Sequence, residues 1–103
     1  MEYSLDLFTR NPETLMMRLA QNCKRRRLEK GYSRRTLSQI TSVPAPSIER
    51  FEKTGKISLE SFCRLAIAFD YYEELGNIMN QTKYSTSEEL EKINRNQNRQ
   101  NGR

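Results

Sequence analysis

The stretch from Tyr32 to Glu52, YSRRTLSQITSVPAPSIERFE, predicts two short helices joined by a tight turn. Ser33 is a good N-cap for the first helix, because its hydroxyl can accept a hydrogen bond from an amide of the first turn. Leu37 and Ile40 lie three positions apart, so we expect both to face inward. The break between the two helices is expected at residues 41–43.

The second helix of this stretch is expected to begin after Pro44. Ile48 and Phe51 form its inward pair, again three positions apart. The other residues are expected to face outward, where they could contact a partner: Ala45, Pro46, Ser47, Glu49 and Arg50. Two short helices around a turn, flanked by basic residues, suit the major groove of DNA.

Upstream, the pattern predicts a longer helix from residue 11 to about Lys30. Asn11 can cap its start, with a proline and an acidic residue in the first turn, and Gly31 can form a left-handed C-cap. The expected core stripe of this helix is Leu15, Leu19, Cys23 and Leu28, with Met16 at its edge. The N-terminal arm, residues 1–10, is too apolar for a disordered segment, so we expect it to pack on another surface.

Downstream of Glu52, the segment KTGKIS predicts a loop in which Gly55 permits a positive φ. Ser58 is expected to start another helix, which closes the core with Leu59, Phe62, Leu65, Ala66 and Phe69. A fifth helix, from about Tyr71 to Asn80, holds more apolar residues than its length requires. They either complete the core of one chain or form a dimer seam: Tyr72, Leu75, Ile78 and Met79.

From Gln81 the composition turns polar and ends in NRNQNRQNGR, which cannot bury enough apolar surface to offset chain entropy, so disorder is expected there. Within this tail, residues 85–89 can cap a short helix that carries Leu90 and Ile93. That helix could dock on its own domain, on a second copy or on another protein. The expected organisation is an arm (1–10), one domain (11–80) and a polar tail (81–103).

Positive charge is concentrated in the first two thirds of the chain. The chain has 103 residues and a formal net charge of +5; residues 1–69 hold 13 basic and 7 acidic side chains, whereas residues 70–103 hold 5 and 6. Seven basic residues fall between Lys24 and Arg35, with Glu29 as the one acidic residue among them. Such a cluster is usually a solvated face, but its position beside the two short helices favours contact with phosphate groups.

The same composition argues against an enzyme, a metal protein and a membrane protein. The chain has no histidine, and the adjacent acidic residues at 73–74 and 88–89 point to different parts of a helix surface. Cys23 and Cys63 lie far apart in apolar patterns, so they are expected to be small buried hydrophobes rather than a disulfide or metal ligands. No stretch approaches the roughly 18 apolar residues of a membrane span, so we expect a cytoplasmic protein with no cofactor.

Three segments extend the pattern of the opening stretch: RLEKGYSRRTLSQI from Arg27, VPAPSIERFEKTGK from Val43 and SLESFCRLAIAF from Ser58. In this order and register they resemble the lambda-repressor and Cro type of helix-turn-helix domain, the XRE family, over about residues 15–79. The resemblance implies an all-α fold, with a five-helix lambda-repressor-like DNA-binding domain and a polar C-terminal tail. It also implies double-stranded DNA as the partner.

By the register of this resemblance, the second short helix, which begins after Pro44, is the recognition helix. Arg27 and Glu52 would form a buried ion pair that holds the long helix against it. Arg34 would contact the DNA backbone at the start of the first short helix. The further phosphate contacts would be Arg35, Lys53 and Lys56, with Lys24, Arg25 and Lys30 as additional candidates.

The chain departs from the family at the start of the recognition helix, where Pro44, Ala45 and Pro46 offer no side-chain hydrogen bond. Apolar contacts remain there, for example with thymine methyl groups. Polar reading of the bases would fall to Ser47, Glu49 and Arg50. Among these, the Arg50 guanidinium suits a bidentate bond to guanine.

These expectations lead to a homodimeric, sequence-specific DNA-binding regulator, most simply a repressor that acts on the nucleoid at a short inverted repeat. The alternative is a HipB-like antitoxin, which would repress its own operon and bind a HipA-type kinase toxin. The N-terminal arm and the tail with Leu90 and Ile93 fit that alternative, and they fit an ordinary tail equally well.

Overall fold

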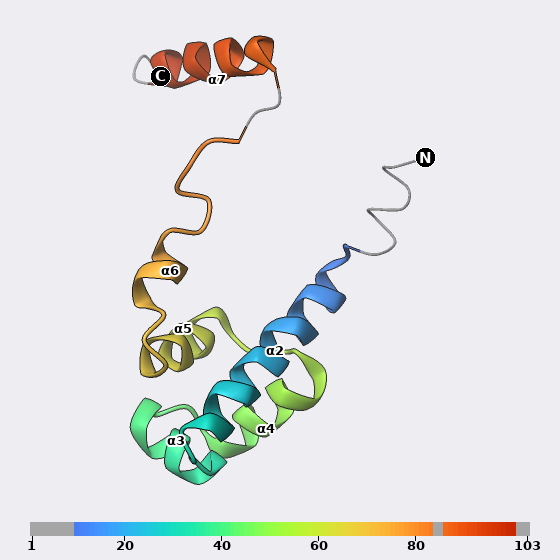
Figure 1. The fold of residues 1–103 in the computed structure, drawn as a ribbon, viewed down its shortest axis with the longest axis vertical. Helices are drawn as coiled ribbons and strands as arrows, with labels where there is room; N and C mark the ends of the chain where they lie inside the picture. Colours follow the sequence, from blue (N-terminus) through green and yellow to red (C-terminus); the bar gives the residue numbers. More distant parts are fainter. Residues whose placement is uncertain (1–9, 84–85, 101–103) are drawn as a thin grey trace.

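The structure, a computed structural model, describes residues 10–83 and 86–100, which form helices and connecting turns with no strand among them. The helices are α2 (Pro12–Glu29), α3 (Arg34–Thr41), α4 (Ala45–Thr54), α5 (Leu59–Ala68), α6 (Tyr72–Gly76) and α7 (Ser87–Gln100). The expected all-α class is therefore confirmed for this part of the chain. Figure 1 shows α2 crossing the group formed by α3, α4 and α5. The expected packing of the N-terminal arm concerns residues 1–9, which lie outside the described residues.

Three helices begin at the side chains that the sequence predicts as caps. Asn11, Ser33 and Ser58 each accept a hydrogen bond from the amide three residues further on, at 2.8, 3.0 and 3.1 Å. These bonds satisfy amides that have no partner inside the helix, which is why α2, α3 and α5 start where they do. The long helix α2 ends before Gly31, which has the expected left-handed conformation with φ +72°.

The turn between α3 and α4 is held by one threonine hydroxyl. Thr41 donates from its Oγ1 to the Leu37 carbonyl at 2.8 Å and accepts from the Val43 amide at 3.2 Å. Thr41 and Val43 are both buried, so this hydroxyl satisfies an amide that water does not reach. Thr41 belongs to α3, and the break therefore starts one residue later than expected, at Ser42 with φ +65°.

The recognition-helix candidate α4 is longer than expected, because Lys53 and Thr54 continue it. The segment KTGKIS is thus a loop only from Gly55, which has the expected positive φ of +77°. Gly55 lies against the backbone of α2. A Cβ at this position would stand 3.0 Å from both the Met16 carbonyl carbon and the Met17 nitrogen. The end of α4 and the first half of α2 therefore meet at very short range.

The hydrophobic core lies where α2, α3, α4 and α5 meet. Its largest fully buried side chains are Phe51, Leu37, Ile48, Leu65 and Val43. The inward pair predicted for α4, Ile48 and Phe51, is confirmed. Phe62 of α5 packs edge to face on Phe51, with ring centroids 5.9 Å apart, so α5 closes the core as expected.

The core stripe predicted for α2 is wrong for its leucines. Leu15 is 55% exposed, Leu28 is 56% exposed and Leu19 lies at the surface, whereas Cys23 is buried as expected. The buried face consists instead of Ala20, Cys23 and Arg27. Small residues on this face allow α4 to approach the α2 backbone, and the bulky leucines are turned to the flanks.

Two further residues expected in the core are exposed. Ile40 is 51% exposed, because the buried face of α3 runs through Leu37 and Thr41, four residues apart. A polar residue takes the inward position because its hydroxyl binds the turn. Leu59 is exposed because it is the first residue of α5, and the buried residues of that helix lie in its last turns, at Leu65 and Ala66.

The helix expected at 71–80 is much shorter than predicted. α6 covers only Tyr72–Gly76, and the chain turns at Met79 with a positive φ of +60°. Gly76 and Asn77 are poor helix formers and end it. Tyr72, Ile78 and Met79 are exposed, so these residues do not complete the core of a single chain.

The tail contains a longer helix than predicted. α7 begins after Thr86, whose hydroxyl accepts from the Glu89 amide at 3.0 Å, and it continues to Gln100 through residues expected to be disordered. The disorder expected for the last ten residues is therefore wrong for 94–100, which are helical, and residues 101–103 lie outside the described part of the chain. In Figure 1, α7 stands apart from the other helices. No helix in the described part of the chain is long and apolar enough to cross a membrane.

Candidate nucleic-acid interface

An ion-pair cluster centred on Glu52 joins three helices. The expected pair between Arg27 and Glu52 is present and bidentate, with Nε donating to Oε2 at 2.7 Å and Nη2 donating to Oε1 at 3.0 Å. Arg34 at the start of α3 donates from its Nε to the same Oε1 at 3.0 Å. Arg27 also donates from Nη1 to the Tyr32 carbonyl at 2.9 Å. One carboxylate of α4 therefore holds α2 and α3 in place.

The three charged side chains of this cluster differ in burial, and burial affects the pKa of Glu52. The side chains of Glu52 and Arg27 are 1% and 7% exposed, whereas that of Arg34 is 35% exposed. Burial opposes the charge on Glu52, but the hydrogen bonds and charges of Arg27 and Arg34 outweigh it, so the pKa of Glu52 is lowered from its ordinary value. The Glu52 carboxylate is therefore ionised at neutral pH, and the partly exposed Arg34 reaches from it to the surface.

The register of the sequence predicts a DNA-backbone contact for Arg34 and gives no sign of its bond to Glu52. The two residues are 18 positions apart, on different helices, and no spacing rule connects them. Nε of Arg34 is committed inside the protein, which leaves its terminal Nη groups for an outside contact. Glu52 therefore sets the position of Arg34 on the surface.

The outer face of α4 carries most of the predicted contact residues. Arg50 and Lys53 are exposed, as is Pro46, whereas Ala45, Ser47 and Glu49 are half-buried. The side chain of Arg50 has no hydrogen bond or ion pair with any described residue. A cation without an internal partner, on a helix held by a buried ion pair, is available to an external acceptor.

Glu49 is engaged within α4. Its Oε2 accepts from Lys53 Nζ at 2.8 Å, four residues further along the helix. The hydrogen bond to Lys53 comes first among the causes that lower the pKa of Glu49, followed by the charges of Lys53 and Arg34. Glu49 and Lys53 are expected as separate contacts from the sequence, although their i, i+4 spacing is the standard signal for such a pair.

The N-terminus of α4 offers few amides to an anion. The Ser47 and Ile48 amides both donate to the Pro44 carbonyl, at 2.9 and 3.1 Å, and Pro46 has no amide hydrogen. Pro44 is the N-cap and makes no side-chain hydrogen bond. An anion bound on this side would therefore depend on side chains rather than on the helix end.

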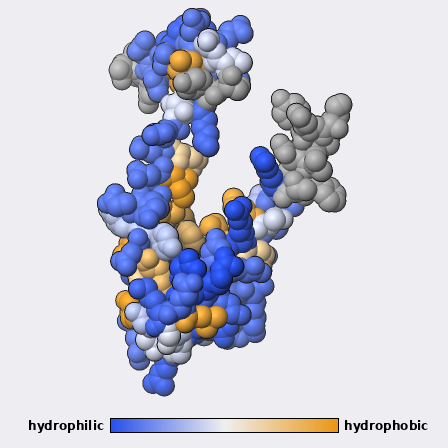
Figure 2. Space-filling model, in the orientation of Figure 1, coloured by the Kyte–Doolittle hydropathy of each residue, from blue (hydrophilic) through white to orange (hydrophobic). Residues whose placement is uncertain are grey.

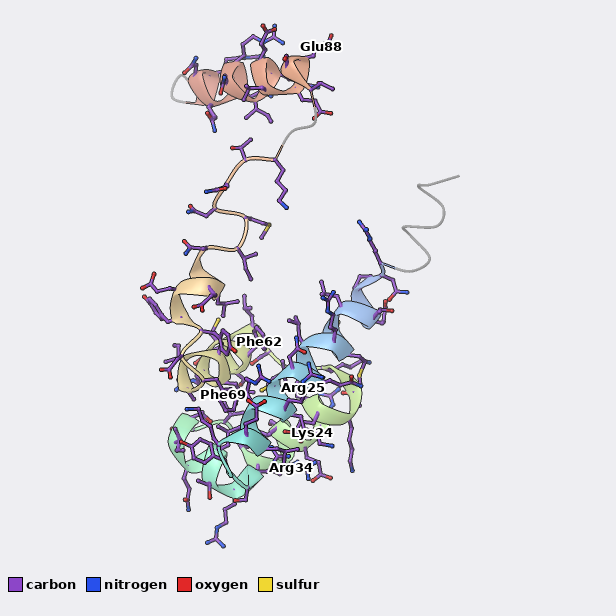
Figure 3. The ribbon with its side chains drawn as sticks, in the orientation of Figure 1. Lys24, Arg25, Arg34, Phe62, Phe69 and Glu88 are labelled. Atoms are coloured by element: carbon purple, nitrogen blue, oxygen red, sulfur yellow. The ribbon has the colours of Figure 1, made fainter. Side chains whose placement is uncertain are left out.

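Basic residues on the neighbouring elements widen the positive surface. Arg35 of α3 and Lys56 after α4 are exposed and have no side-chain partner among the described residues. On α2, Lys24 and Lys30 are likewise exposed, and Arg25 donates to Asn22. Figure 3 shows Lys24 and Arg25 on α2 and Arg34 on the neighbouring helix α3.

The described residues contain no group of three or more side chains suited to hold a metal ion. Cys23 and Cys63 are free thiols, the first buried and the second half-buried. Burial, followed by the charge of Glu52, raises the pKa of Cys23 to about 12, although Arg27 acts in the opposite direction. The Cys23 thiol therefore stays protonated and unreactive at neutral pH.

Comparison with known proteins gives no further guide to this surface. No protein-family model, no curated protein and no solved structure matches the chain. The case for the interface therefore rests on the geometry and charge of the α3–α4 pair.

Proposed function

We propose that this protein is a sequence-specific, double-stranded DNA-binding regulator, with α2 to α6 forming a five-helix lambda-repressor-like domain. The observation that carries the proposal is the exposed, unpaired Arg50 on α4, the second of two short helices joined by a tight turn. A helix presented in this way fits the major groove, where a guanidinium can donate two hydrogen bonds to guanine.

Base reading in this proposal depends on few residues. Arg50 reads guanine, and Ser47 contributes a hydroxyl near the helix start. Ala45 and Pro46 contact thymine methyl groups, because they have no side-chain donor or acceptor. Glu49 is bonded to Lys53, so it orients basic side chains rather than reading cytosine. Specificity therefore also depends on DNA shape and deformability.

Phosphate contacts come from the basic residues around α3 and α4: Arg34, Arg35, Lys53 and Lys56. Arg34 contributes the Nη groups that its bond to Glu52 leaves free. Each neutralised phosphate releases counterions. With about 6 to 10 contacts in a dimer, affinity falls about 10³ to 10⁵ fold between 50 and 200 mM salt.

The protein acts as a homodimer, because one recognition helix covers only a few base pairs. The exposed apolar residues around α6, Tyr72, Ile78 and Met79, support the dimer-seam alternative, since they have no place in the core of one chain. A hollow of about 360 Å³ between α5 and α6, lined in part by Cys63 and Ile67, continues this surface. Such a dimer represses transcription in the cytoplasm by occupying an inverted repeat on the nucleoid.

The test is selection of bound sequences from random duplex DNA, followed by affinity measurements with two arginine variants. Arg50→Ala is expected to weaken binding to the selected site about 10- to 100-fold while changing binding to unrelated DNA far less. The matched control is Arg18→Ala on α2. Arg18 is two residues before the buried Ala20, which places it about 160° around the helix from that residue, on the opposite face.

Two results would count against the proposal. If selection enriches no sequence and binding does not depend on salt, the protein is not a DNA-binding regulator of this kind. If Arg50→Ala weakens selected and unrelated DNA equally, Arg50 contacts phosphate and base reading lies elsewhere. An inverted repeat in the selected sequences, with half-sites about 34 Å apart, would support the dimer.

The second candidate, a HipB-like antitoxin with a HipA-type kinase toxin as its partner, is favoured by one observation. α7 is an exposed helix with Leu90 and Ile93 on the same side, and it stands away from the rest of the chain. A helix of this kind suits a protein partner. Copurification with the product of an adjacent kinase-like gene would support this candidate, and an operon without such a gene would argue against it.

A further inference from the structure

An apolar groove lies between α2 and α5, on the side where α6 begins. It has a volume of about 320 Å³. Its lining is mostly apolar and aromatic (Leu19, Cys23, Phe62, Ala66, Phe69 and Tyr71), with Asn22 and Arg26 as its polar members. Figure 3 shows Phe62 and Phe69 on the side of α5 that faces α2. None of the residues predicted to contact DNA lines this groove, so it calls for a different occupant.

Exposed apolar side chains extend from the groove along α2 toward the N-terminus of that helix. Leu15 lies one turn before Leu19, and both are exposed, although the sequence pattern places them in the core. Figure 2 shows hydrophobic surface on the side of the molecule where α5 and α6 face α2. Leu15 and Leu19, which lie outside the core, thus form an apolar track along α2 that ends in the groove.

One polar atom at the edge of the groove lacks a partner. Nε of Arg26 is buried and has no hydrogen bond with any described residue, while Nη2 of the same side chain pairs with Glu29 at 2.8 Å. The guanidinium of Arg26 also interacts with the Tyr71 side chain, which lines the same groove, so only its Nε is left for an acceptor supplied from outside the described residues. The occupant of the groove should therefore bring apolar groups together with a carbonyl or carboxylate oxygen.

We propose that residues 1–9 of the same chain occupy this groove. Their sequence, MEYSLDLFT, contains apolar side chains at five of nine positions and the two carboxylates Glu2 and Asp6. The apolar residues match the groove and the track of Leu15 and Leu19. The backbone carbonyls and the two carboxylates can supply the acceptor that Arg26 lacks, and their charge complements the basic exposed face of α2.

The chain is long enough to make this contact within one molecule. α2 begins at Pro12, so Leu15 and Cys23 lie about 5 and 17 Å along the helix from its first residue. Nine extended residues span up to about 30 Å. A reversal at residues 10–11 would therefore carry the arm back over Leu15 and Leu19 and into the groove.

The segment 1–9 fits better than the other candidates for this surface. α7 offers only Leu90 and Ile93 as apolar residues, and it is joined to the domain by the longer segment 77–86. A second copy would have to bind at its own free concentration, whereas the arm is tethered by two residues and has a high effective concentration.

The first test uses nuclear Overhauser effects between methyl groups of the full chain. In protein with labelled alanine and leucine methyls, we expect cross-peaks between Ala66 and Leu5 or Leu7. A mixed sample, with alanine labelled in half of the molecules and leucine in the other half, reports contacts between copies. Cross-peaks in the first sample alone support the proposal. Cross-peaks in the mixed sample assign the groove to the arm of a second copy and overturn it, as does their absence from both.

The second test compares two leucine-to-serine variants of the full chain. Leu5→Ser is expected to lower the thermal midpoint by about 4–8 °C, and Leu59→Ser, at an exposed site outside the groove, by much less. Equal shifts, or no shift for Leu5→Ser, would overturn the proposal. Neither result depends on DNA, so a failure here leaves the proposed function to its own test.

Discussion

Glu52 is a single buried carboxylate that joins three helices. It lies on α4 and holds Arg27 of α2 and Arg34 of α3 through three hydrogen bonds. A buried ion pair adds little net stability compared with apolar side chains, but the loss of one partner leaves an uncompensated charge in the core. Removing Glu52 should therefore be worse than removing either arginine.

Glu52→Leu is expected to destabilise the protein by about 3–5 kcal/mol, because it leaves two guanidinium groups without their acceptor. Arg27→Met should be less severe, since Arg34 still pairs with Glu52. Chemical denaturation of both variants measures the difference. Glu60→Leu, which removes an exposed partner of Arg64, is the control and should change stability by less than about 1 kcal/mol. Melting of Glu52→Leu like the wild type would contradict the role of the cluster.

Stability should also depend on pH through the same carboxylate. The pKa of Glu52 in the folded protein is below its ordinary value, so its contribution is fully present above the unfolded pKa of about 4.3 and is lost as pH falls through the folded value. We expect the thermal midpoint to fall on acidification below about pH 4.5. Glu52→Gln should flatten that fall. Glu49→Gln should flatten it less, because the side chains of Glu49 and Lys53 are 47% and 65% exposed and solvent screens their pair.

At the scale of elements, the contact between α2 and the end of α4 fixes the relative position of the two helices. Gly55 combines a positive φ with a backbone neighbour at 3.0 Å from any added Cβ. Gly31 has a similar φ of +72° but nothing within 4 Å of such a Cβ. A substitution at Gly31 therefore tests backbone strain alone, whereas one at Gly55 tests backbone strain together with helix packing.

Gly31→Ala is expected to cost about 1 kcal/mol, since only the left-handed conformation is penalised. Gly55→Ala should cost clearly more, because α2 must also move away from α4. Denaturant midpoints of the two variants give the comparison. Equal losses of stability in the two variants would mean that the close contact between α2 and α4 does not contribute to stability.

The α3–α4 pair could be predicted from local sequence because its signals are local. Ser33 caps α3, Ile48 and Phe51 repeat at helical spacing, and Gly55 allows the terminal turn of α4. Of the inward pair predicted for α3, Leu37 is confirmed and Ile40 is wrong, since Thr41 is buried in its place. Its burial depends on the Val43 amide, which needs an acceptor only after the turn has formed.

At the scale of the whole molecule, α7 behaves as a separate element. The radius of gyration is 18.2 Å, compared with about 13 Å for a compact domain of 100 residues, in line with a helix that stands away from the bundle. Isolated helices of this length are marginal in water. α7 therefore has little influence on the folding of α2 to α6.

A chain that ends at Asn80 is expected to keep the thermal midpoint of the full protein within about 3 °C, because α7 covers none of the core. The helical signal in circular dichroism should decrease by no more than the fraction of helical residues that belong to α7. A large drop in the midpoint would show that the tail packs on the domain in solution. If the tail binds a partner protein, the shortened chain should lose that partner and keep the DNA binding proposed for α3 and α4.

The sequence by itself determined the all-helical class, the caps of α2, α3 and α5, the inward pair of α4 and the partners Arg27 and Glu52. Most of these features follow from residues a few positions apart. The ion pair follows instead from the register in which the sequence resembles the helix-turn-helix family. The tertiary structure decided that Ala20 rather than a leucine faces α4, that Arg34 joins Glu52 and that α6 is short. The reason is physical: which face of a helix is buried, and which charge finds a partner, depends on how closely another helix approaches, and no local pattern contains that distance.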